Sequence, residues 1–324
     1  MSICSKWVIP LLFSLLLVVA LASLSLGASG YTILDFVNGR APKVIIELRL
    51  TRLLAAVSAG IVLASSGILL QYALRNPLAD PYLLGVSPAA FLAVSVYALL
   101  APTLSTFYTL ITPVAIAGGL AGLLLTLIIS RLGETSHSVI LAGIAVATSL
   151  SGLSFAIDYI ASTKFGWSPS HALFGGFAGV PPAHVYILAF IAAASCITAL
   201  VLAAHVESLL YGDDASMLSG VEPRRARIAA LVAAGVTVAA ITGYTGVIGF
   251  VGLIAPNAAR RVLQCVEARL VAVTSMLLGA AITTSADLAA RLIGNVAGLG
   301  EIPAGALIAI FGGFTLAMLV ARSG

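Results

Sequence analysis

Charged residues are scarce in this chain of 324 residues, since Asp, Glu, Lys and Arg together make up only 9% of it. Soluble globular domains carry about 25% of these residues. Apolar residues reach 60%, and the mean hydropathy is +1.14. This balance excludes an intrinsically disordered protein and a typical water-soluble enzyme. It indicates an all-α polytopic membrane protein, with residues 1–324 forming a single transmembrane domain.

Motifs for nucleotide and metal chemistry are also missing from the sequence. It contains no G-x-x-x-x-G-K-[ST] phosphate-binding loop, and none of its lysines follows a glycine. No H-E-x-x-H occurs, and the four histidines and three cysteines have no spacing typical of metal ligands. We therefore expect no catalytic residue, no metal site and no cofactor. The net charge of +4 is better explained by membrane topology than by a nucleic-acid partner, and the membrane lipid is the expected surrounding.

One short pattern points to an enzyme instead. Residues 27–30, GASG, match the G-x-S-G pattern of rhomboid-type intramembrane serine proteases. Such an enzyme needs a histidine base within reach of Ser29. Every histidine lies near a predicted helix end or in a loop, so chance explains the match better.

Ten runs without charged residues predict membrane-spanning helices, each about 20 residues long. The first run could be a signal peptide, but its length and the lack of a clean A-x-A cleavage site favour a retained helix. The eighth run is short, which indicates a partial or tilted helix. The runs cover residues 7–26, 53–74, 84–101, 107–130, 138–157, 184–204, 228–245, 247–259, 270–286 and 303–321.

An even number of spans places both termini on the same side of the membrane. With the N-terminus in the cytoplasm, ten of the 16 Lys and Arg residues lie in the cytoplasm and six outside. Basic residues are enriched in cytoplasmic loops. We therefore expect a multi-pass protein of the plasma or inner membrane with both termini in the cytoplasm.

Two segments resemble each other at an offset of 175 residues. RLLAAVSAGIVLA begins at Arg52 in span 2, and RIAALVAAGVTVA begins at Arg227 in span 7. Spans that are five apart cross in opposite directions, and this is typical of the inverted repeats of transporters. We expect spans 2–5 and 7–10 to form such a repeat. The alternative is that two Ala-rich helices are alike by composition.

Several longer stretches, taken together and in order, carry a resemblance to a known family. They are LRLTRLLAAVSAGIVLASSGILLQYALRNPLADPYLLGVSPAA at 48–90, LAGIAVA at 141–147, LLYGDDASMLSGVEPRRARIAAL at 209–231, TGVIGFVGLIAPNAARRV at 245–262, and ADLAARL with GEIPAGALIAIFGG within 286–313. They are similar to the FecCD family of ABC-importer permeases. The chain departs from the family pattern at Thr51, at Asn257 and at residues 312–314, where Pro, His and a G-A-P sequence are usual.

The resemblance implies a permease subunit of an ABC importer for an iron chelate such as a ferric siderophore, for haem or for cobalamin. It implies a homodimer with two ATP-binding cassette subunits, which hold ATP-Mg, and one extracytoplasmic solute-binding protein. The alternative is a secondary transporter driven by an ion gradient. Such a transporter needs carboxylates within the membrane, and the cores of the predicted spans hold almost none.

Residues 205–227 form the predicted cytoplasmic coupling loop. Asp213 or Asp214 can cap a short helix there, and Gly220 can end it. The resemblance implies that this helix docks in a cleft of the ATPase subunit, whereas the alternative is a plain basic loop. The residues assigned to coupling are Gly212, Asp213, Asp214, Met217, Leu218, Gly220, Arg224 and Arg225, with Arg224, Arg225 and Arg227 fastening the helix to span 7.

Three arginines lie on the outer side in the predicted topology. Arg49 and Arg52 are spaced i, i+3 on one helix face, and Arg291 ends span 9. The resemblance implies that they pair with carboxylates of the solute-binding protein, which suits the bidentate geometry of arginine. The alternatives are lipid headgroups or a pair within the chain, since Asp287 is i, i+4 from Arg291.

Two short polar segments lie on the cytoplasmic side. Asn76 and Leu78 flank Pro77, which bars the residue before it from a helix. Ser136 and His137 precede span 5. The resemblance implies that both segments form the inner gate at the dimer axis, and the alternative is two ordinary connecting loops.

Overall fold

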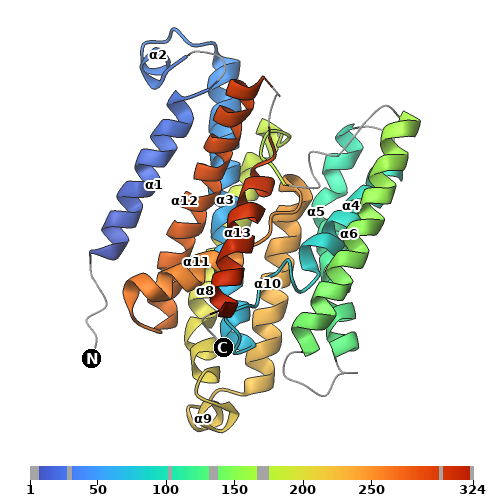
Figure 1. The fold of residues 1–324 in the computed structure, drawn as a ribbon, viewed down its shortest axis with the longest axis vertical. Helices are drawn as coiled ribbons and strands as arrows, with labels where there is room; N and C mark the ends of the chain where they lie inside the picture. Colours follow the sequence, from blue (N-terminus) through green and yellow to red (C-terminus); the bar gives the residue numbers. More distant parts are fainter. Residues whose placement is uncertain are drawn as a thin grey trace.

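The computed structural model describes residues 7–27, 31–100, 104–130, 138–165, 175–298 and 302–321. Over these residues the chain is helical and contains no β-strand, as the composition predicted (Figure 1). Each of the ten uncharged runs corresponds to one helix. These helices are α1 (Val8–Ser25), α3 (Lys43–Ala73), α4 (Val86–Leu100), α5 (Leu104–Ser130), α6 (Ser138–Phe165), α8 (Val185–Leu209), α10 (Pro223–Thr245), α11 (Val251–Leu263), α12 (Ala268–Ala297) and α13 (Ala304–Ala321).

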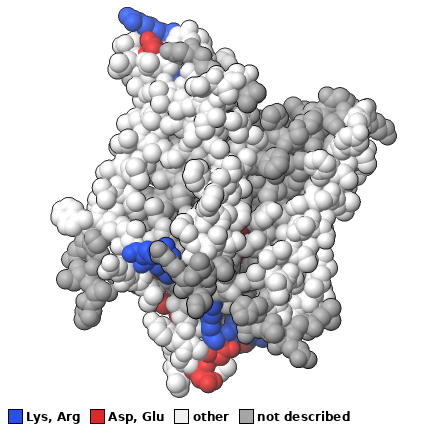
Figure 2. Space-filling model, viewed as in Figure 1, with Lys and Arg blue, Asp and Glu red and all other residues white. Residues whose placement is uncertain are grey.

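Three further short helices lie between the long ones: α2 (Ile33–Val37), η1 (Pro182–His184) and α9 (Asp213–Leu218). Seven of the helices described are long and apolar enough to cross a membrane, and α4 and α13 provide shorter apolar helices. The partial helix predicted for the eighth run is α11, which has 13 residues. On the face shown in Figure 2, charged side chains gather at the upper tip and in the lower part, with a broad band nearly free of charge between them.

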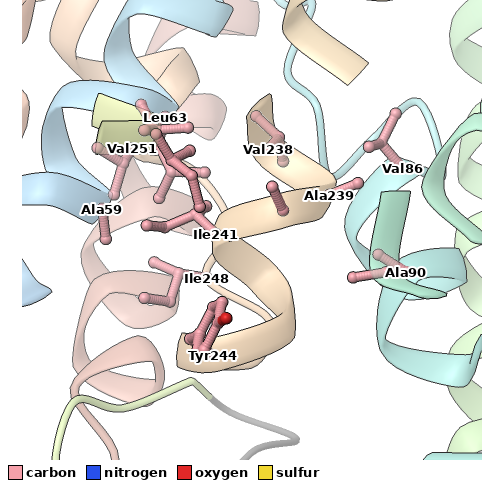
Figure 3. Packing of buried hydrophobic residues seen from close by; sticks show 14 of the residues in the cluster. Ala59, Leu63, Val86, Ala90, Val238, Ala239, Ile241, Tyr244, Ile248 and Val251 are labelled. Atoms are coloured by element: carbon pink, nitrogen blue, oxygen red, sulfur yellow. The ribbon is translucent and has the colours of Figure 1, made fainter. Parts of the chain in front are cut away.

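Helix α3 lies at the centre of the bundle, because 83% of its most apolar 18-residue stretch is buried. It packs against α8, α10, α11 and α12. In Figure 3, α10 lies between two sets of buried side chains, with Ile241 toward Ala59 and Leu63 of α3 and Ala239 toward Val86 of α4. Burial of these apolar groups on both sides fixes α10 within the bundle.

Small residues bring the central helices close together. A Cβ atom built on Gly60 would lie closer than 3.0 Å to the carbonyl oxygen of Gly279 in α12, and one built on Gly67 would meet the carbonyl oxygen of Gly252 in α11. Glycine is the residue that permits such backbone contact. Helix α1 differs, since only 17% of it is buried, and it lies at the edge of the bundle (Figure 1).

Candidate functional site

A short helix, α9, protrudes at the lower end of the molecule in Figure 1. Gly212 precedes it with φ +114°, and Gly220 follows it with φ +81°, which are values that glycine adopts without strain. The amide of Gly220 donates to the carbonyl of Met217 at 3.0 Å, and the amide of Val221 donates to that of Ser216 at 3.0 Å. Gly220 therefore ends the helix, as the sequence predicted.

The prediction that Asp213 or Asp214 caps α9 is wrong, because Gly212 holds the cap position and no side chain caps the helix. The Asp213 carboxylate instead accepts hydrogen bonds from Nη1 and Nη2 of Arg227, at 3.1 and 2.5 Å, and from Nη2 of Arg75. The hydrogen bond from Arg227, with the charges of both guanidinium groups, holds the pKa of Asp213 below its ordinary value. The carboxylate thus stays ionised and ties α9 to α10 and to the end of α3.

Of the three arginines expected to fasten α9, only Arg227 reaches Asp213. Arg225 pairs with Glu222 at 2.5 Å on an exposed surface, and Arg224 is exposed. The second fastening group is Arg75, whose Nε donates to the carbonyl of Leu209 at the end of α8. Sequence reasoning missed Arg75 because its partners lie 134 and 138 residues away.

The tip of α9 exposes apolar side chains. Leu218 is 91% exposed and Met217 is more than half exposed, as is Tyr211, which precedes the helix. Asp214 is exposed beside them. A short helix that is held rigidly and displays apolar groups has the properties of a docking element.

The chain turns sharply where α3 ends. The side-chain Oδ1 of Asn76 accepts a hydrogen bond from the amide of Leu78 at 2.8 Å, and the carbonyl of Asn76 accepts one from the amide of Ala79 at 3.1 Å. Leu78 is half-buried. The other two predicted gate residues, Ser136 and His137, lie outside the described residues. Residues 76–78 are called the gate segment below.

A polar network holds the gate segment from the side of α11. Nδ2 of Asn257 donates to the carbonyl of Pro77 at 2.8 Å. Arg260 donates through Nη2 to Oδ1 of Asn257 at 2.8 Å and to Oε1 of Gln71 at 2.5 Å. Asn257, which departs from the family pattern, therefore anchors the gate segment to α11.

The predicted docking arginines form a buried cluster at the opposite end of the bundle. Asp287 is fully buried. It accepts a hydrogen bond from Nε of Arg52 at 2.8 Å and forms an ion pair with Nε of Arg291 at 3.2 Å. The pair between Asp287 and Arg291 is the i, i+4 alternative that the sequence left open.

The same cluster holds the end of α1. Nη1 of Arg49 donates to the carbonyls of Leu24 and Tyr31, at 2.5 and 2.8 Å, and Nη2 of Arg291 donates to Oγ of Ser23 at 2.6 Å. Arg49 and Arg291 are each 8% exposed. Each of the three arginines therefore has a partner within the chain. Their docking to a solute-binding protein stays a prediction.

A cavity of about 560 Å³ opens between α4, α5, α10 and the start of α13. Its wall is mainly apolar and aromatic, with hydroxyl groups such as that of Tyr244, which lies 2.9 Å from Oγ1 of Thr112. Among the residues described, no group of three or more His, Cys, Asp or Glu side chains could hold a metal ion. The lining includes Arg52, Phe91, Tyr108, Phe177, Tyr244 and Pro303.

Comparison with known proteins finds relatives over nearly the whole chain. The chain is 33% identical to the vitamin B12 import system permease protein BtuC of Vibrio cholerae, over 82% of this chain and 79% of the relative. It is 32% identical to the Fe(3+) dicitrate transport system permease protein FecC of Escherichia coli, over 87% and 85%. It is 29% identical to the hemin transport system permease protein HmuU of Yersinia pestis, over 96% and 94%.

The fold is also similar to that of a solved structure. This structure is described as an inward-facing conformation of a metal-chelate type ABC transporter, and it matches with a TM-score of 0.81 at 26% identity over 98% of this chain and 99% of that chain. The family model of the FecCD transport family matches residues 14–322. The chain therefore belongs to the FecCD transport family.

Proposed function

We propose that this chain is the membrane permease subunit of an ABC importer and that α9 is the element through which a separate ATPase subunit drives it. The observation that carries the proposal is the geometry of α9. Its apolar tip is exposed, and its base is fixed to α3 and α10 through Asp213, Arg75 and Arg227. A force applied at the tip is thereby transferred to the bundle.

The proposed assembly has two copies of this chain, two ATP-binding cassette subunits and one extracytoplasmic solute-binding protein. ATP and Mg²⁺ would bind only to the cassette subunits, and this chain would need no cofactor. Residues 1–324 would form one transmembrane domain, with residues 205–227 as the cytoplasmic coupling loop. In support, α9 protrudes from one end of the bundle with charged groups around it (Figures 1 and 2).

We propose ten membrane crossings and an inverted repeat. In support of ten crossings, one helix corresponds to each of the ten uncharged runs. In support of the repeat, α3 begins beside α2 at the upper end of Figure 1, whereas α10 begins beside α9 at the lower end. With α9 in the cytoplasm, both termini would also lie there.

The substrate proposed is an iron chelate such as a ferric siderophore, haem or cobalamin. The permease relatives are named for vitamin B12, ferric dicitrate and hemin. The mainly apolar cavity offers a bulky ligand little to bind tightly, which suits a substrate that a separate protein delivers. Closure of the ATPase subunits would move α9 and open the gate formed by Asn76, Leu78, Ser136 and His137.

Docking of the solute-binding protein at Arg49, Arg52 and Arg291 is proposed on the resemblance alone. These side chains also hold α1 and α12 together, so a charge reversal there would disturb the fold as well as any docking surface. Binding affinity must therefore be compared between variants whose melting temperatures match.

Replacing both Met217 and Leu218 with aspartate is expected to weaken association with the ATPase subunit by at least about tenfold, because exposed apolar side chains at the centre of an interface contribute most of the binding energy. The amount of ATPase subunit recovered with the tagged permease measures this effect. The permease itself should melt unchanged, since both side chains are more than half exposed.

Arg40→Gln is the control, because Arg40 is also exposed but follows α2, at the end of the bundle opposite to α9. Its complex should be recovered in nearly the amount of the unmodified complex. Normal recovery of the ATPase subunit with the double aspartate variant would contradict the proposed function of α9.

A further inference from the structure

We propose that Arg75 is a positioning residue that transmits movement of α9 to the gate segment, residues 76–78. The inference rests on the proposed functions of α9 and of the gate segment. In this proposal the side chain of Arg75, which lies between α3 and the gate segment, connects the gate segment to α9.

The backbone of Arg75 forms the turn that leads into the gate segment. Arg75 follows the cap residue of α3, Leu74, and its φ is +51°. Residues with a Cβ atom rarely adopt this region, so the surrounding contacts must hold the conformation in place. A change in those contacts would therefore alter the direction in which the chain leaves α3.

The side chain of Arg75 supplies two of those contacts, and both partners lie in the proposed coupling loop, residues 205–227. Its Nε donates to the carbonyl of Leu209, where α8 ends, and its Nη2 donates to the carboxylate of Asp213, where α9 begins. A displacement of α9 thus pulls directly on the residue that precedes Asn76.

The gate segment is fixed on its other side to a different helix. The carbonyl of Pro77 accepts a hydrogen bond from Nδ2 of Asn257 at 2.8 Å, and Arg260 holds Asn257 in turn through Oδ1 at 2.8 Å. Both belong to α11. Any movement of α9 relative to α11 must therefore be absorbed between residues 75 and 77.

Arg227 provides the matched control for this idea. It binds the same carboxylate of Asp213 from α10, and its Nε donates to the carbonyl of Ala73 at 3.2 Å. Arg227→Gln removes the two guanidinium hydrogen bonds from α10 to Asp213, so it weakens the attachment of α9. It leaves the contact between Arg75 and Asp213 in place. Comparing Arg75→Gln with Arg227→Gln therefore distinguishes transmission of movement to the gate segment from mere attachment of α9 to the bundle.

The test uses the full complex of permease and ATPase subunits in lipid nanodiscs. Amide hydrogen exchange of Asn76, Leu78 and Ala79 is measured without nucleotide and after addition of ATP and vanadate, which traps ADP with vanadate in the ATPase subunit. Each of these amides donates a hydrogen bond in or beside the turn. In the unmodified complex, exchange should change by at least about fivefold between the two states, which is the lower end of typical coupling between sites.

With Arg75→Gln, the exchange of these amides should become the same in both states to within about twofold, while the ATPase subunit remains bound and hydrolyses ATP. In the Arg227→Gln complex, the difference in amide exchange between the two states should persist. Arg75→Lys should restore part of the change, because lysine keeps the charge but loses the fixed fork of donors.

If amide exchange in the Arg75→Gln complex changed with nucleotide as much as in the unmodified complex, the inference would be overturned. Equal loss in the Arg75→Gln and Arg227→Gln complexes would also overturn it, because Arg75 would then only anchor α9. If the unmodified complex itself showed no change with nucleotide, the proposed function of α9 would fail, and the inference about Arg75 would fail with it.

Discussion

Replacing Asp287 with asparagine is expected to reduce sharply the yield of folded, monodisperse protein. Asp287 is fully buried and faces the guanidinium groups of Arg52 and Arg291. Asparagine keeps the size of the side chain but removes its charge, which leaves two positive groups in a site of low polarity. Breaking a buried ion pair in this way costs about 3–5 kcal/mol. Thermal unfolding in detergent, followed by size-exclusion chromatography, measures the effect.

Glu222→Gln is the control for this substitution. It also removes a carboxylate from an arginine, but the side chains of Arg225 and Glu222 are 86% and 49% exposed. Exposed pairs contribute about 0–1 kcal/mol, so this variant should melt close to the unmodified protein. Equal melting temperatures for Asp287→Asn and Glu222→Gln would show that the buried pair does not hold α3 and α12 together.

Replacing Gly67 with alanine is expected to destabilise the bundle. The added Cβ atom would lie closer than 3.0 Å to the carbonyl oxygen, carbonyl carbon and Cα of Gly252. These are backbone atoms, so no side-chain rotation can relieve the clash, and α3 and α11 must separate. Inserting one carbon into a packed core typically costs about 1–3 kcal/mol. Thermal unfolding and the uptake rate of the assembled complex should both fall.

Gly152→Ala in α6 makes the same chemical change in open space, because no atom lies within 4 Å of the added Cβ. Alanine favours a helix over glycine by about 1 kcal/mol, so this variant should be as stable as the unmodified protein or more so. If Gly67→Ala and Gly152→Ala had the same effect on the melting temperature, the close contact between α3 and α11 would be refuted.

The helices could be predicted from the sequence because the signal is local. A run without charge that is long enough to span a bilayer must form its hydrogen bonds within itself, and so becomes helical. This reasoning located each long helix and anticipated the short α11. Helix α1 contains none of the glycines that bring the central helices into close contact, and it lies at the edge of the bundle.

The contacts of the site could be predicted only in part, because most of them join residues far apart in the chain. The i, i+4 spacing of Asp287 and Arg291 indicated their pair, whereas nothing local indicated that Arg52 would join them from 235 residues away. Asp213 looked like a helix cap because its position in the sequence fits one. Its carboxylate instead binds Arg227, which is 14 residues away and was expected to fasten the helix, and Arg75, which is 138 residues away and was not expected. Charge-assisted hydrogen bonds are stronger than a neutral cap.

The measurement that tests the account most directly is uptake into sealed vesicles containing the purified chain, with and without its ATPase subunit and binding protein. Ferric hydroxamate, haem and cobalamin are each supplied as labelled substrate. We expect neither ATP hydrolysis nor uptake by the chain alone, and ATP-dependent uptake of one substrate by the full assembly, unaffected by an uncoupler. Uptake driven by an ion gradient in vesicles that contain this chain alone would contradict the account.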